Sequence, residues 1–298
     1  MKTFDPDLRR SWLFGPGADA SVHEVMRACC ADVLILDLED STPHTRREEA
    51  RQGLGSLVRS WREAGHMVAV RINALDGEGP TDLAAAMPAR PDIILYPMAT
   101  SGAQMHALHA ALSHWEHAAG IPPGTTEIVP VCETALGVVE VRNIAAGSSR
   151  IRCALLGAED LAADLRAERR PDALELDHAR RRFLLECRAA AIEPIDAPYT
   201  FDDAEGAARE AIYARRLGYR CKALVLPAHA QPINDALTPN EDEVVRATAM
   251  VAAFEAARLR GDDRALVDGL WVEVPTYRNA QRLIERASRL RNLDRRII

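Results

Sequence analysis

The chain of 298 residues contains only two lysines, Lys2 and Lys222, among many arginines. Schiff-base aldolases and pyridoxal-phosphate enzymes need a lysine amine at the reacting carbon. Lys2 lies in the amino-terminal tail, and Lys222 precedes an apolar run, which places it at the start of a predicted strand. Covalent amine catalysis is therefore disfavoured, and a metal-assisted reaction gains weight.

The sequence also lacks the marks of a secreted, membrane or nucleic-acid-binding protein. No apolar segment reaches the ~18 residues that a membrane helix needs, and the polar residues 1–10 contain no apolar core of a secretory signal. The net charge of −7 and the absence of a basic block argue against nucleic acid. The six cysteines form no Cys-x-x-Cys pair, so we expect reduced cysteines in a cytoplasmic protein.

Short apolar runs alternate with helix-like segments along most of the chain. This alternation predicts βαβ units and a parallel sheet, and eight units over about 220 residues fit a (β/α)₈ TIM barrel. No Gly-x-Gly-x-x-Gly follows the first run, so a dinucleotide-binding sheet has little support. We predict an α/β barrel over residues 1–235. Its strands are expected within residues 11–14, 33–36, 67–70, 93–96, 127–134, 153–161, 193–195 and 223–226.

Residues 236–298 form a tail that is too long for a simple barrel end. The stretch Thr238–Asp242 has a cap and an acidic first turn, which predicts a helix that runs to Arg260. Residues 261–263 break it, residues 266–275 are irregular or hairpin-like, and residues 276–290 form a last helix. We expect this helical extension to act as a lid or an oligomerisation arm.

Two of the apolar runs end in carboxylates, at Glu133 and at Asp160. In a barrel the chemistry gathers at the carboxyl ends of the strands. These side chains could be tied to helix amides or arginine, but two carboxylates at adjacent strand ends would repel each other without a cation. We therefore expect both to bind Mg²⁺, with water or substrate completing the shell. The other charged residues predicted at strand ends are Asp37, Glu39, Asp40, Arg71, Glu159 and Asp196.

Arg71 follows the third apolar run and has two possible roles. It could pair with the acidic group 37–40, or its planar fork could bind a substrate carboxylate through two hydrogen bonds, which we favour. Glu39 and Asp40 are expected to hold metal-bound water or Arg71 rather than the metal. Asp37 is expected to work with Arg71 in the catalytic group.

Five segments resemble one known family in the same order along the chain. The family is the citrate lyase beta subunit-like branch of the HpcH/HpaI aldolases, which includes malyl-CoA and citramalyl-CoA lyases. The resemblance extends from about residue 10 to residue 287. Its segments are Arg10-Ser-Trp-Leu-Phe-Gly-Pro-Gly17, Leu34-Ile-Leu-Asp-Leu-Glu-Asp40, Val70-Arg-Ile-Asn73, Val131-Cys-Glu-Thr134 and Gly157-Ala-Glu-Asp-Leu161.

The resemblance implies a TIM barrel that binds Mg²⁺ through Glu133 and Asp160. It implies that Arg71 and the backbone amides of Gly157 and Ala158 bind the substrate beside Glu133. Without the resemblance, Gly157 and Ala158 could equally be turn residues or an anion-binding pair of amides. It also implies homotrimers or hexamers in which the carboxy-terminal lid covers a neighbour's active site. The lid residue, usually Asp, corresponds to Glu273 in the stretch 268–273, which we expect to be the catalytic acid or base.

The function implied is Mg²⁺-dependent cleavage or formation of a 3-hydroxy-carboxyacyl-CoA, with a 2-oxo acid and an acyl-CoA as the small-molecule partners. Three alternatives stay open: a CoA-independent 2-oxo acid aldolase, an acyl-CoA thioesterase and a non-catalytic subunit of a lyase complex. The chain departs from the family at Pro97-Met98, where Pro-Lys is common, and at Leu226-Pro-Ala-His229, where His-Pro-Ser-Gln is common.

Overall fold

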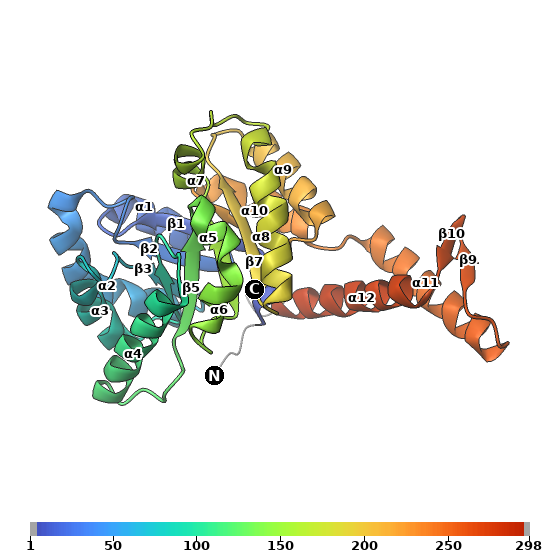
Figure 1. Ribbon diagram of the computed structural model, residues 1–298, viewed down its shortest axis with the longest axis horizontal. Helices are drawn as coiled ribbons and strands as arrows, with labels where there is room; N and C mark the ends of the chain where they lie inside the picture. Colours follow the sequence, from blue (N-terminus) through green and yellow to red (C-terminus); the bar gives the residue numbers. More distant parts are fainter. Residues whose placement is uncertain (1–4, 295–298) are drawn as a thin grey trace. The chain divides into compact units, whose positions relative to one another are not determined.

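The computed structural model describes residues 5–294 and contains the predicted barrel. Eight parallel strands pair in sequence order, and the last pairs with the first, so the sheet has no open edge (Figure 1). The predicted TIM barrel is confirmed. The strands are β1 (Ser11–Pro16), β2 (Val33–Asp37), β3 (Met67–Arg71), β4 (Ile93–Tyr96), β5 (Glu127–Cys132), β6 (Cys153–Leu156), β7 (Glu193–Tyr199) and β8 (Cys221–Leu224).

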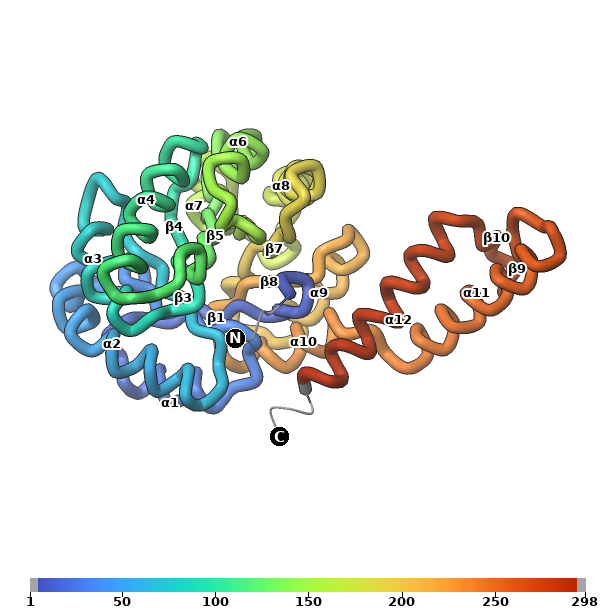
Figure 2. Tube along the Cα trace, turned by 90° about the horizontal axis from the view of Figure 1, so that it is seen from below, coloured from blue at the N-terminus to red at the C-terminus, as the bar shows by residue number. Residues whose placement is uncertain are grey.

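Helices connect the strands and lie around them (Figure 2). In α2 the buried residues Ala50, Leu54, Val58 and Trp61 recur at helical spacing, which gives the helix one apolar face toward the barrel. Helix α4 begins with a capping box between Ser101 and Gln104. The helices are α1 (Ala20–Ala28), α2 (Arg47–Glu63), α3 (Gly79–Ala86), α4 (Gly102–Ala118), α5 (Ala135–Val139), α6 (Val141–Ala146), α7 (Glu159–Asp164), α8 (Asp177–Ala189), α9 (Ala204–Leu217) and α10 (Ala230–Leu237).

The barrel interior is filled by side chains from alternate strand positions, because successive residues of a strand point to opposite faces. Asp37, Arg71 and Glu133 each lie two positions beyond an inward-facing residue of their own strand. The same alternation that builds the core therefore aims these three charged side chains into the mouth of the barrel. The core cluster comprises Trp12, Val33, Ile35, Met67, Ala69, Ile93, Leu95, Val129, Val131, Cys153, Leu155, Ile195, Cys221 and Ala223.

Several strand boundaries differ from the prediction, and those of β7 and β8 change where charged residues lie. Strand β7 continues to Tyr199, and β8 begins at Cys221. Asp196 and Lys222 are therefore paired inside neighbouring strands, with no exposed surface, on the face opposite the core residues. The expectation that Asp196 lies at the barrel mouth was wrong, because its strand is longer than its apolar run.

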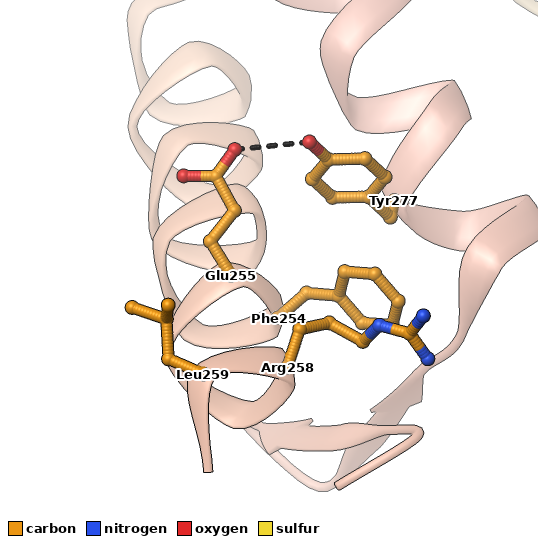
Figure 3. A pocket seen from close by; sticks show the side chains of 5 residues that line it. All are labelled: Phe254, Glu255, Arg258, Leu259 and Tyr277. Carbon is orange, nitrogen blue, oxygen red and sulfur yellow. Dashed lines mark hydrogen bonds between the residues drawn. The ribbon is translucent and has the colours of Figure 1, made fainter. Parts of the chain in front are cut away.

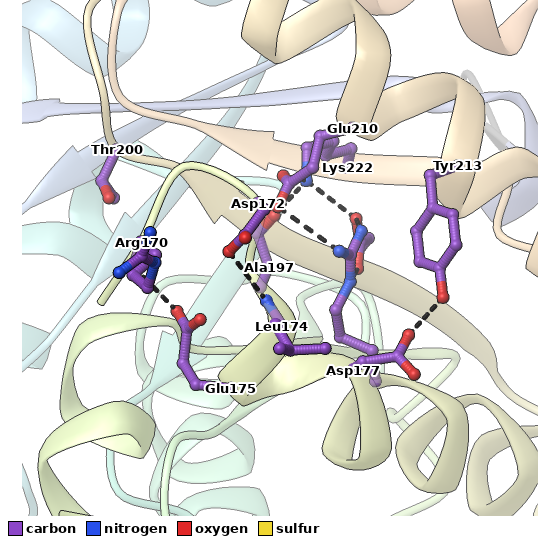
Figure 4. A network of polar contacts seen from close by, with 12 residues as sticks. Arg170, Asp172, Leu174, Glu175, Asp177, Ala197, Thr200, Glu210, Tyr213 and Lys222 are labelled. Atoms are coloured by element: carbon purple, nitrogen blue, oxygen red, sulfur yellow. Dashed lines mark hydrogen bonds and ion pairs between the residues drawn. The ribbon is translucent and has the colours of Figure 1, made fainter. Parts of the chain in front are cut away.

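A buried charge network explains how these strands tolerate polar residues on their outer face (Figure 4). The Lys222 Nζ atom lies 2.8 Å from Asp196 Oδ2 and 2.6 Å from Glu210 Oε2. Arg180 of α8 donates to both Asp196 oxygens, at 2.9 and 2.7 Å. The amine of Lys222 thus faces the helix layer rather than the mouth, while Lys2 lies outside the described residues.

The chain divides into two compact units, one up to Asn234 and one from Asp235. In the second unit, α11 (Glu241–Leu259) packs on α12 (Val274–Asp294), and the strands β9 (Ala265–Val267) and β10 (Leu270–Val272) form a hairpin. Figure 3 shows Tyr277 of α12 donating its hydroxyl hydrogen to Glu255 of α11 over 2.9 Å, beside a surface pocket. None of the helices within residues 5–294 is both long and apolar enough to cross a membrane.

Candidate active site

Arg71 is the last residue of β3, at the carboxyl end of the barrel. Its Nε and Nη2 atoms donate to the two oxygens of Asp37 over 2.7 and 2.6 Å. Asp37 has no exposed surface, and it also accepts the backbone N–H groups of Glu39 and Ser41, at 3.0 and 2.7 Å. Burial disfavours the charged form of Asp37, but Arg71 and Ser41 outweigh it and hold the pKa of that carboxyl below its ordinary value.

This geometry changes the role expected for Asp37. Asp37 has no exposed surface, and both of its oxygens are bonded to Arg71. Its part in catalysis stays a prediction, and this geometry would have it orient Arg71. The remaining nitrogen of Arg71, Nη1, lies 2.8 Å from Glu39 and 3.5 Å from Asp40. The guanidinium also lies 5.1 Å from the ring centre of Phe14, a contact that the sequence pattern did not suggest.

Glu133 follows β5 and is almost fully buried, at 3% exposure. Its Oε1 atom accepts the backbone N–H of Met98 over 2.7 Å. Met98 has a positive φ of 48°, which is rare for a residue with a side chain and which turns this amide toward the carboxylate. Residue 98 therefore orients Glu133 through its backbone N–H, which no sequence motif predicted.

Gly157 follows β6 and packs directly on Glu133. A Cβ atom at position 157 would lie 2.4 Å from the Cβ and 2.9 Å from the Oε2 of Glu133, so only glycine fits. The amide of Gly157 donates to the carbonyl of Cys132 over 3.1 Å. This amide is therefore already used by the sheet in the structure, and the expectation that it binds an anion stays a prediction. Ala158, the next residue, opens α7.

Asp160 lies in the first turn of α7 with its side chain exposed. Although this side chain is exposed, partial desolvation by neighbouring atoms raises the pKa of Asp160, and the charge of Asp40 raises it further. Burial likewise raises the pKa of Glu133 to about 7, against the Met98 amide and Arg71, and Asp160 adds to the rise. Glu133 thus feels the negative charges of Asp160 and Asp40, and Asp160 feels that of Asp40.

The carboxylate Glu39 shows the same excess of negative charge. Burial raises the pKa of Glu39 to about 8, although Arg71 opposes the change, and Asp40 and Glu133 contribute to it. Arg71 therefore compensates the charges of several acidic side chains at once. A divalent cation would relieve this repulsion, and carboxylate oxygens are the ligands that Mg²⁺ prefers.

The donor set fits a metal that is only partly coordinated by protein. Within residues 5–294, no group of three or more acidic, histidine or cysteine side chains is arranged to hold a metal ion. Glu133 and Asp160 would supply two oxygens, and substrate or water the others, as is common for Mg²⁺. Glu273 lies in the second unit, exposed, between β10 and α12.

A closed barrel with acidic side chains and one arginine at the carboxyl ends of its strands is the architecture of a barrel enzyme. The chain belongs to the HpcH/HpaI aldolase/citrate lyase family, whose model matches residues 10–227.

Individual relatives match almost the whole chain. It is 32% identical to the citrate lyase subunit beta of Leuconostoc mesenteroides subsp. cremoris, over 94% of each chain. It is 32% identical to the (3S)-malyl-CoA thioesterase of Cereibacter sphaeroides, over 89% of each. Among solved structures, CitE of Mycobacterium tuberculosis in complex with magnesium, acetoacetate and coenzyme A matches with a TM-score of 0.74 and 26% identity, covering 94% of this chain and 98% of that one.

Proposed function

We propose that the chain is a Mg²⁺-dependent carbon–carbon lyase, which cleaves or forms a 3-hydroxy-carboxyacyl-CoA with a 2-oxo acid and an acyl-CoA as the other side of the reaction. The observation that carries this proposal is the placement of Glu133 and Asp160, both with raised pKa values, at the barrel mouth beside Arg71. The magnesium and coenzyme A in the related CitE complex support the same assignment.

Bound Mg²⁺ would act as a Lewis acid toward the substrate oxygen that becomes the ketone of the 2-oxo acid. Glu133 and Asp160 would hold it. Arg71, oriented by Asp37, would bind the substrate carboxylate through Nη1. For this, the Glu39 side chain would have to move away from that nitrogen. The amide of Ala158 would donate to the same carboxylate. The chain thus contributes charge and orientation rather than a covalent nucleophile.

The acyl thioester leaves as an enolate, which needs a proton on its α-carbon. Glu273 is our candidate for this acid, acting from the second unit of another copy in a trimer or hexamer. One methylene more than aspartate moves its carboxyl group by about an ångström, which is enough to change a rate. The variant Glu273→Gln should lower kcat strongly, whereas Glu273→Asp keeps a carboxyl group and should remain active with a changed kcat.

The direct test removes the two proposed ligands. Glu133→Ala and Asp160→Ala should each abolish Mg²⁺-dependent cleavage, while Glu63→Ala, a change at an exposed glutamate of α2, should retain it. Oxo acid and acyl-CoA release would be followed separately by chromatography. Full activity of the native protein in excess EDTA would contradict the proposal.

A second candidate is hydrolysis of an acyl-CoA thioester, which the similarity to the (3S)-malyl-CoA thioesterase favours. Hydrolysis releases free CoA and leaves the carbon skeleton whole, whereas cleavage releases a 2-oxo acid and keeps the thioester. Product analysis with one carboxyacyl-CoA therefore separates the two reactions. Free CoA without any oxo acid would establish the thioesterase.

A further inference from the structure

The segment between β6 and α8 contains an arginine, Arg169, that no part of the proposed reaction uses. Its side chain is only 13% exposed. Its Nε atom donates to Glu159 over 3.0 Å, and its Nη1 atom donates to Glu175 over 2.7 Å. Its Nη2 atom donates to Thr200 over 3.1 Å. One guanidinium therefore joins the first turn of α7, the loop before α8 and the loop after β7.

The contact with Glu159 matters because of its place in the chain. Glu159 directly precedes Asp160 in the first turn of α7. Its Oε1 atom accepts two hydrogen bonds, from Arg169 and from the hydroxyl of Thr200 over 2.6 Å. The guanidinium also lies 5.5 Å from the ring centre of Phe201, which fixes its plane. The residue next to Asp160 is thus held from two directions.

The other end of α7 is tied to the Glu133 loop. Asp164, the last residue of α7, accepts the backbone N–H of Ala135 over 2.7 Å. Ala135 comes two residues after Glu133. Helix α7 is therefore anchored toward Glu133 at one end and toward the loop after β7 at the other.

The loop that carries Arg169 adopts a backbone that only such contacts would maintain. Arg166 and Ala173 both have positive φ values, of 56° and 50°. Residues with a side chain rarely adopt this conformation, so surrounding contacts must hold them there. Figure 4 shows Thr200 and Glu175, two of the groups that Arg169 joins, together with Arg170, whose backbone N–H meets Glu175.

We propose that Arg169 is a positioning residue, whose contacts with Glu159 and Thr200 hold α7 so that Asp160 meets Glu133 at one cation. This inference rests on the proposed function, because it assumes that Asp160 and Glu133 bind Mg²⁺. It assigns to Arg169 the part that outer hydrogen-bond partners play in metal sites, where their loss weakens metal affinity about 10- to 100-fold.

The experiment measures Mg²⁺ binding itself, by titration calorimetry on the full chain, at a temperature where circular dichroism shows every variant folded. Arg169→Gln should weaken Mg²⁺ binding about tenfold or more. Arg170→Gln is the matched control, because it removes the same charge from the next residue, whose side chain is exposed. It should bind Mg²⁺ as the native protein does. Equal affinity of Arg169→Gln and native protein would overturn the proposal.

A second variant keeps the test sharp if Arg169→Gln does not fold. Thr200→Val removes one hydrogen bond to Glu159 and leaves Arg169 paired with Glu175. It should weaken Mg²⁺ binding several-fold, and unchanged binding would overturn the proposal. Combining it with Glu159→Gln should weaken binding by less than the product of the two single effects, because both changes act on one contact. Strictly multiplicative effects would count against the proposed contact.

Failure of the proposed function has a different result. If the native protein binds no Mg²⁺, or if Glu133→Ala and Asp160→Ala bind it as the native protein does, the metal site itself is wrong. If those two variants lose Mg²⁺ binding and Arg169→Gln retains it, the proposed metal site is supported and only the positioning role of Arg169 is contradicted.

Discussion

One glutamate lies at the amino end of strand β5 and another directly follows its carboxyl end, both on the inward-facing side. The two differ in how their negative charges are compensated. At the amino end, Glu127 accepts two hydrogen bonds from Arg9, at 3.0 and 2.9 Å, and a third from Arg152 at 2.5 Å. At the carboxyl end, Glu133 accepts the Met98 amide, and burial raises its pKa to about 7. Both side chains are about equally buried, so exposure does not explain the difference.

The difference lies in the surrounding charges. Two arginines surround the carboxylate at the amino end, whereas Arg71 at the carboxyl end already binds Asp37 and faces Glu39 and Asp40. A buried charge without a partner is costly, and folds normally avoid it. We infer that the amino end is built for stability and that the carboxyl end is left short of positive charge so that a cation can bind.

The largest effect should follow Glu133→Gln. Mg²⁺-dependent activity should fall at least about a thousandfold, since several kcal/mol of transition-state stabilisation depend on the metal. The free energy of unfolding without Mg²⁺ should stay the same or rise, because the variant removes a buried carboxylate that the fold does not neutralise. Kinetics and urea unfolding in EDTA check both parts. A loss of stability greater than about 1 kcal/mol would place Glu133 with the structural ion pairs.

The same substitution at the other end, Glu127→Gln, should do the reverse. It replaces the carboxylate that binds the buried Arg9 by a neutral amide and should cost about 3 kcal/mol of stability, with the activity of folded protein unchanged. Urea unfolding measures the loss. Arg152→Gln is the matched control: Arg152 is 47% exposed, so its loss should cost no more than about 1 kcal/mol. If both variants cost the same, burial is not what distinguishes these pairs.

The pH dependence of stability should separate the two ends further. The pKa of Glu133 is raised to about 7 in the folded chain, above its value in the unfolded chain. Its contribution is therefore fully present below about pH 4.3 and is lost as pH rises toward 7. Without Mg²⁺, the melting temperature should fall over this range, and Mg²⁺ should oppose the fall. Melting curves in EDTA check this. An equal slope for Glu133→Gln would contradict it.

The smallest effect should follow Met98→Gly. The hydrogen bond to Glu133 comes from the backbone N–H of Met98, which glycine also has, and glycine adopts a positive φ at less cost than methionine. Mg²⁺ affinity should stay within about twofold, and stability should change by no more than about 1 kcal/mol. Calorimetry and thermal unfolding measure the two quantities. A large loss of affinity would show that the methionine side chain itself belongs to the site.

The barrel could be predicted from the sequence because its eight short apolar runs are separated by helical segments. Glu133 and Arg71 could be placed at strand ends because each directly follows such a run, whereas Asp160 follows β6 only after residues 157–159 and lies in the first turn of α7. Asp196 could not be placed correctly, since it also follows an apolar run but lies inside a longer strand and pairs with Lys222. Which face a charged residue takes depends on the true end of its strand, and apolar runs mark that end only approximately.

The order of apolar and polar residues by itself determined the barrel, the alternation that aims its inward side chains, and the family to which the chain belongs. Only the tertiary structure decided which carboxylates are neutralised. Arg9 and Glu127 are 118 positions apart, and Arg71 and Asp37 are 34 apart. The amide that meets Glu133 depends on the backbone angle of Met98. Charge compensation depends on the distance between side chains in space, which cannot be read from their separation along the sequence.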